Sequence, residues 1–63
     1  MKATFNGVEV KIPKGYTLDS EGNYINNHGV EYALVEYGFG EDTVICLETI
    51  YSKHVRTIVL EKA

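Results

Sequence analysis

The first twelve residues alternate apolar and polar side chains, and this pattern predicts a β-hairpin. The central pair Asn6-Gly7 is preferred in two-residue type I′ turns, which need a positive φ at both positions. Every apolar side chain then lies on one face, and a shift of one residue would destroy this agreement. Pro13 ends the second strand, because it has no N–H to donate. The expected pairs are Met1–Ile12, Lys2–Lys11, Ala3–Val10 and Thr4–Glu9.

Two more turns are predicted between residues 16 and 37. Segments 19–23 and 26–29 each begin with Asp or Asn and contain a glycine suited to a left-handed position. The expected pairs are Tyr16–Asn26, Leu18–Tyr24 and Tyr24–Tyr32. The residues expected to share one surface are Tyr16, Leu18, Tyr24, Tyr32 and Leu34.

The runs Thr43–Tyr51 and His54–Lys62 carry apolar residues on both faces. A tight turn at Ser52-Lys53 predicts the pairs Ile45–Leu60, Cys46–Val59, Leu47–Ile58 and Ile50–Val55. One face then carries Ile45, Leu47, Ile58 and Leu60. The other carries Val44, Cys46, Ile50, Val55 and Val59. Because successive side chains of a strand point to opposite faces, something must cover the second face.

These patterns predict an all-β fold with one domain, residues 1–63. We expect a small antiparallel meander of hairpins that forms a partly open barrel or a two-layer sandwich. The competing interpretation is an α+β fold with a helix over residues 42–54 and Asp42 as its N-cap. Six β-branched residues from Thr43 to Val55 disfavour this helix.

A chain of 63 residues is near the lower size limit for independent folding, and its single cysteine excludes an intrachain disulfide. We therefore expect a homodimer, a larger protein partner, or both. The unpaired Cys46 suits a reducing compartment, and no apolar stretch reaches the length of a secretory signal core or a membrane helix. The expected location is the cytoplasm, without membrane association.

The formal net charge of −3 argues against a dedicated nucleic-acid binder, which needs Lys and Arg to neutralise phosphates. The alternative hypothesis is nevertheless a small β-barrel that binds single-stranded nucleic acid by tyrosine stacking. Its contact residues would be Tyr51, Lys53, His54 and Arg56. The abundance of Asn, Ile, Lys and Tyr is typical of bacterial and phage chains.

No arrangement of residues points to catalysis, a metal or a cofactor. His28, His54 and Cys46 lack the spacing of metal ligands, and both serines fall in predicted turns. Residues 38–40 contain two glycines but lack the lysine and helix start of a nucleotide-binding loop. We therefore expect no enzyme and no small-molecule substrate.

The leading hypothesis is a non-enzymatic protein-interaction module, such as an inhibitor or regulator of a larger bacterial or phage-target protein. It would act through the second apolar face and through the loop 38–42. In that loop Phe39 stands between two glycines, followed by Glu41 and Asp42, as in an anchor at a contact. The partner-binding residues are Phe39, Glu41, Asp42, Val44, Cys46, Ile50, Val55 and Val59. A third hypothesis is a structural subunit of a larger assembly.

Overall fold

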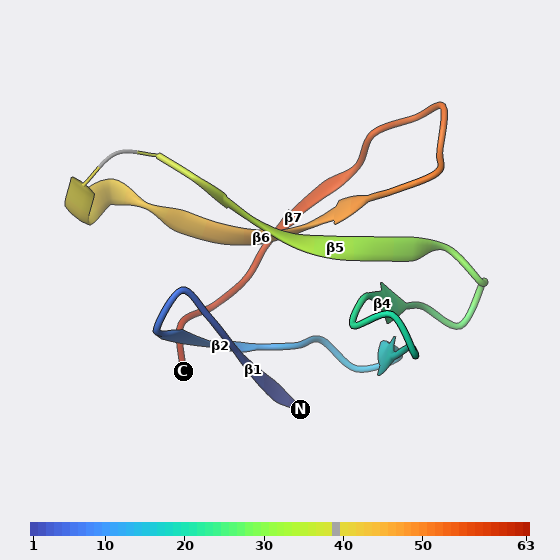
Figure 1. Ribbon diagram of the computed structural model, residues 1–63, viewed down its shortest axis with the longest axis horizontal. Coiled ribbons are helices and arrows are strands. Elements are labelled where there is room, and N and C mark those ends of the chain that lie inside the picture. The colour runs from blue at the N-terminus through green and yellow to red at the C-terminus, as the bar shows by residue number, and fades with distance from the viewer. Residues whose placement is uncertain (39) are drawn as a thin grey trace.

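The computed structural model describes residues 1–38 and 40–63, which contain seven strands in two antiparallel sheets (Figure 1). The strands are β1 (Lys2–Phe5), β2 (Val8–Lys11), β3 (Thr17–Leu18), β4 (Tyr24–Ile25), β5 (Glu31–Tyr37), β6 (Val44–Thr49) and β7 (Thr57–Val59). A single 3₁₀ turn, η1 (Gly40–Asp42), precedes β6. The predicted all-β fold is confirmed. The alternative helix over residues 42–54 is wrong, because the β-branched residues of this segment form β6.

The N-terminal hairpin has the predicted register. β1 pairs with β2 through Lys2–Lys11, Ala3–Val10, Thr4–Glu9 and Phe5–Val8. Asn6 has a φ of 50° and Gly7 a φ of 79°, as a type I′ turn requires. The backbone N–H of Ile12 donates to the carbonyl of Met1 over 2.7 Å, so the pairing continues beyond the strands.

The meander β3-β4-β5 follows the two predicted turns. The side-chain oxygens of Asp19 and Asn26 each accept two backbone N–H groups within their own turn. The predicted pairs Leu18–Tyr24 and Tyr24–Tyr32 are confirmed. Tyr16 lies outside the ladder, but its ring packs edge-on against Tyr32 at a centroid distance of 5.4 Å. Leu18 does not join this aromatic cluster and is 58% exposed.

The hairpin β6–β7 has the predicted register but not the predicted turn. Cys46 pairs with Val59 and Leu47 with Ile58, whereas the expected pair Ile50–Val55 does not form. The reason is a set of hydrogen bonds at Thr49. Its N–H donates to the carbonyl of Arg56, and its hydroxyl accepts the Arg56 N–H and donates to the His54 carbonyl. These bonds close the hairpin earlier and leave residues 50–55 as a loop.

The C-terminal residues join the two sheets. Lys62 forms a bridge with Val10, the Lys11 N–H donates to Glu61, and the Ala63 N–H donates to Glu9. The chain after β7 therefore acts as a third strand beside β2. Within the described residues the sheets do not close into a barrel, because β1, β3 and β7 remain edge strands.

The core lies between the hairpin β1–β2 and the inner face of the five-stranded sheet. Its fully buried members come from both layers and from the C-terminal segment: Val10, Ile12, Tyr24, Tyr32, Ile45, Leu47 and Leu60. Figure 1 shows the hairpin and both termini on one side of the long strands β5 and β6. The apolar face of the hairpin thus covers one face of these strands and leaves the opposite face without a covering layer.

Candidate functional site

The uncovered face of β5, β6 and β7 is the candidate site, and we call it the outer face. Strand register places Val35, Cys46 and Val59 in one row across the three strands. A second row pairs Tyr37 with Val44. The full set that alternates with the core residues is Ala33, Val35, Tyr37, Val44, Cys46, Glu48, Thr57 and Val59. An apolar strip therefore crosses the sheet on the side away from the core.

The exposed part of this strip consists of large apolar side chains. Val59 is 64% exposed, Tyr37 is 47% exposed and Val44 is 38% exposed. A soluble domain of this size rarely leaves neighbouring apolar side chains uncovered without a binding role. Strand register makes Tyr37 and Val44 direct neighbours, so their exposed surfaces are contiguous.

Cys46 belongs to the same strip but offers no surface, because it is only 1% exposed. Cys46 lies between Val35 and Val59 in the cross-strand row, and these flanking side chains can shield its short side chain from solvent. Burial, with a smaller effect of nearby Glu48, raises the pKa of the Cys46 thiol. The thiol is therefore a packed apolar group rather than a reactive nucleophile.

One carboxylate organises the polar part of the outer face. Glu48 accepts hydrogen bonds from the hydroxyls of Tyr37 and Thr57, one on each neighbouring strand. The hydrogen bond to Glu48 raises the pKa of Tyr37, since it favours the protonated phenol. These bonds hold the three strands together across a face that has no packing layer above it.

The loop between β5 and β6 lies at one end of the outer face. Gly38 has a φ of 113°, and a Cβ at this position would lie 2.5 Å from the carbonyl oxygen of Asp42. Only glycine fits this close approach. The loop presents Glu41 and Asp42 as exposed acids within η1. Phe39, the predicted anchor, lies outside the described residues.

The loop between β6 and β7 lies at the opposite end of the sheet from η1 (Figure 1). Two of its apolar residues are exposed, Tyr51 at 85% and Val55 at 69%. The φ of Tyr51 is 58°, a left-handed conformation that a bulky residue rarely adopts. The basic residues expected here are also exposed: Lys53, His54 and Arg56. All four residues of the nucleic-acid hypothesis therefore occur in one loop or at its end.

The structure divides the predicted partner-binding residues into separate groups. Val44 and Val59 share the outer face, while the acids of the 38–42 loop and Val55 lie at opposite ends of it. Ile50 is half-buried, and its N–H donates to the carbonyl of Glu31 at the start of β5. It therefore supplies less surface than the alternating pattern suggests.

Sequence reasoning did not include Tyr37 among the binding residues. The signal was present in the run Val30–Tyr37, where Val35 and Tyr37 alternate with Leu34 and Glu36. Only the pairing of Tyr37 with Val44 shows that this ring extends the apolar strip.

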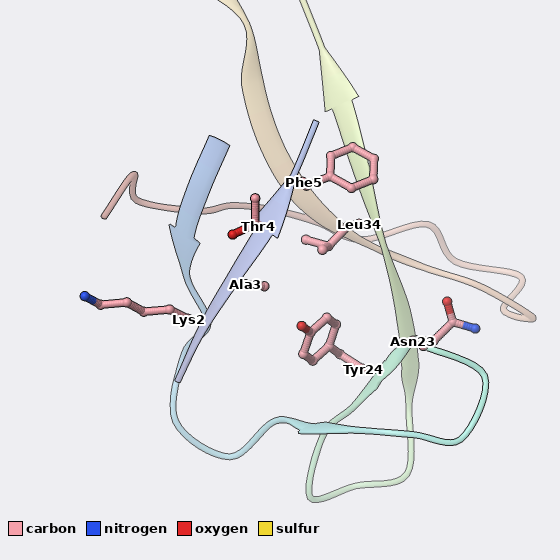
Figure 2. Close-up of a pocket in the computed structure, with 8 residues that line it drawn as sticks. Lys2, Ala3, Thr4, Phe5, Asn23, Tyr24 and Leu34 are labelled. Atoms are coloured by element: carbon pink, nitrogen blue, oxygen red, sulfur yellow. The ribbon is translucent and has the colours of Figure 1, made fainter. Parts of the chain in front are cut away.

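A separate hollow lies between β1 and the β4–β5 region and measures about 510 Å³ (Figure 2). In Figure 2 the rings of Phe5 and Tyr24 and the side chain of Leu34 project into the space beside β1. Among the described residues that line it, Lys2 is the only charged one, and none is a Ser, a Cys, a His or an acid.

Within residues 1–38 and 40–63, no three His, Cys, Asp or Glu side chains gather in a group that could hold a metal ion. In the same part of the chain, no helix has the length and apolar character needed to cross a membrane.

Comparison of the chain with protein-family models, with curated proteins and with solved structures finds no match.

Proposed function

We propose that this chain is a non-enzymatic protein-interaction module that binds a larger protein through the outer face. The observation that carries the proposal is the uncovered apolar strip of Tyr37, Val44 and Val59, with exposed fractions of 47%, 38% and 64%. Burial of such surface contributes about 25 cal/mol per Å² of apolar area, which is the main driving force in most protein association. An inhibitor or regulator of a bacterial or phage-target protein is the kind of role that suits this surface.

The two loops support the proposal through their charge. Exposed acids of η1 border one end of the strip, and the cations Lys53 and Arg56 border the other. An apolar centre with a polar rim is the usual composition of a protein-binding surface. Opposite charges at the two ends would orient a partner along the strands.

Photo-crosslinking in cells of the source organism tests this proposal. A benzophenone amino acid at Val44 should give a discrete adduct with one larger protein, while the same group at Leu18, also exposed, should not. With the benzophenone amino acid in place of Tyr37, the substitution Val44→Asp should abolish the crosslink, because it places a charge in the apolar contact. Equal adducts from Leu18 and Val44 would count against the proposal.

Self-association is measured on the same samples. Light scattering of the purified chain over a range of concentrations reports whether a second copy covers the outer face. A dimer that Val44→Asp converts to a monomer would assign the strip to self-association instead of a larger partner.

Binding of single-stranded nucleic acid is the second candidate function, and one observation favours it. Tyr51 is 85% exposed, holds a strained left-handed backbone and has the cations Lys53 and Arg56 within the next five residues. Strain of this kind is found at functional sites, and exposed rings beside cations stack on bases. Fluorescence anisotropy with labelled oligothymidylate at low salt tests it. We expect Tyr51→Ala to weaken any binding by tenfold or more, and absence of binding at low salt excludes this function.

A further inference from the structure

The outer edge of β7 has no neighbouring strand among the described residues, although the residues that follow β7 pair with β2. The N–H of Leu60 donates to Ile45 and the N–H of Thr49 donates to Arg56, so residues 56, 58 and 60 direct their backbone groups toward β6. In an antiparallel ladder the intervening residues direct theirs the other way. Thr57 and Val59 therefore point their N–H and C=O groups outward, and the described residues supply no backbone partner for them.

Pro13 accounts for this free edge. β2 runs beside the C-terminal segment, with Lys11 bonded to Glu61 and Glu9 bonded to Ala63. Extending that register places Pro13 opposite Val59, where an N–H is needed and proline has none. The segment that follows β2 therefore diverges from β7 at Pro13. A groove of about 240 Å³ remains between this segment and the end of β7. Its lining residues are Lys11, Ile12, Pro13, Val59, Leu60 and Glu61.

We propose that the edge of β7 accepts an extended, acidic strand from a protein partner, which pairs with Thr57 and Val59 and enlarges the five-stranded sheet. An antiparallel partner strand would lie beside β7 in the position that β2 would occupy if it continued past Pro13. Two of its residues would exchange four backbone hydrogen bonds with Thr57 and Val59. The side chain opposite Val59 would lie on the outer face and extend its apolar strip.

Charge decides the chemistry of the partner strand. The segment that leads into β7 contains Lys53, His54 and Arg56, all exposed, and no acid occurs between Thr49 and Leu60. An antiparallel strand that starts opposite Val59 runs toward the cations Lys53 and Arg56. The fitting sequence therefore has an apolar residue first and acidic residues after it. This inference rests on the proposed function only in taking the partner to be a protein.

The probe is an acetylated ten-residue peptide of alternating threonine and valine that ends in three aspartates. NMR of the labelled chain at peptide saturation should show at least tenfold slower hydrogen exchange for the amides of Thr57 and Val59. The outward amides of Lys2 and Thr4, on the free edge of β1, are the internal control and should not change. Protection at β1 instead of β7, or no protection, overturns the proposal.

Edge prolines provide the matched variants. Thr57→Pro removes an outward N–H without breaking a backbone hydrogen bond to β6, so it should weaken peptide binding by tenfold or more. Thr57→Val keeps the N–H and loses only the hydroxyl, and Thr4→Pro places the same proline on the other edge. Both should bind as the unmodified chain does. Equal affinity for Thr57→Pro overturns the proposal, and circular dichroism confirms that each variant is folded.

Replacing the three aspartates of the peptide by lysines tests the charge argument. The affinity should fall at least tenfold at low salt, and unchanged affinity contradicts the assignment of an acidic partner. Protection of Thr57 and Val59 in the free chain at high concentration would assign the edge to a second copy, against the proposal. Protection by oligothymidylate would likewise assign it to nucleic acid. Failure of the peptide alongside a Val44 crosslink would reject strand pairing while leaving the proposed function intact.

Discussion

The hairpins β1–β2 and β6–β7 differ in how their two faces are used. β1–β2 buries its apolar face in the core and exposes Lys2, Thr4, Glu9 and Lys11 on the other. β6–β7 also buries one face, through Ile45 and Leu47, but its second face carries Val44 and Val59. The first hairpin is complete once the chain has folded. The second retains apolar surface after folding, and this surplus is what makes it a candidate for binding.

The largest expected effect comes from the inner face of β6. Leu47 is fully buried, so Leu47→Ala should lower the free energy of unfolding by about 2–5 kcal/mol. A domain of this size has only roughly 3–9 kcal/mol in total, so this variant should approach the unfolded state. On the outer face, Val59→Ala should change stability by only about 0.5 kcal/mol. Urea denaturation measures both, and equal losses would show that the faces do not differ.

The turn of the first hairpin gives the next effect. Gly7→Ala meets no steric clash, but its φ of 79° is unfavourable for a residue with a Cβ, at a cost of about 1–2 kcal/mol. Hydrogen exchange should quicken in β1 and β2 before it does in β6 and β7. If hydrogen exchange quickens equally in both hairpins, they unfold as one unit. The two hairpins then differ in their surfaces but not in their local stability.

The loop of the second hairpin should respond in the opposite direction. Tyr51 holds a φ of 58° with little burial to offset the strain. Tyr51→Asn should raise the free energy of unfolding by about 1 kcal/mol, because asparagine tolerates the left-handed region. Tyr51→Phe keeps the strain and serves as the control, with unchanged stability. A stability gain together with lost binding would show that the tyrosine is kept for contact rather than for folding.

The smallest effect is the response of the outer face to alkaline pH. Burial raises the pKa of the Cys46 thiol above its ordinary value of 9.0. The folded chain then keeps a proton that the unfolded chain releases, so stability falls as the pH rises toward and beyond 9.0. Cys46→Ala should flatten this decline in thermal denaturation curves recorded at increasing pH, and an unchanged slope would assign the decline to other groups.

Tyr37 continues the same trend at higher pH. Its hydrogen bond to Glu48 needs the protonated phenol and raises the pKa of Tyr37 above 10.0. The stabilisation is complete below pH 10.0 and is lost as the pH rises through the folded-state pKa. Tyr37→Phe removes the hydroxyl and should abolish this second decline. Persistence of the decline in Tyr37→Phe would show that the bond to Glu48 is not its source.

The sequence predicted β1–β2 down to its register because the signals are local. The Asn6-Gly7 turn and the alternation of twelve residues need no information from the rest of the chain. The register of β6–β7 was also predicted, because a tight turn centred on Ser52-Lys53 pairs Leu47 with Ile58, as the structure does. Its turn was not, because the hydrogen bonds of Thr49 to His54 and Arg56 depend on side-chain geometry across the hairpin.

The sequence by itself determined the all-β fold, the pairing of the hairpins and the presence of more apolar positions than one core can use. Only the tertiary structure decided which of those positions stay exposed. Cys46 and Val59 share a face in the sequence pattern, yet one is 1% exposed and the other 64%. Alternation assigns a side chain to a face, whereas exposure depends on which strands flank it. Cys46 is flanked on both sides, and Val59 lies on the strand that Pro13 leaves uncovered.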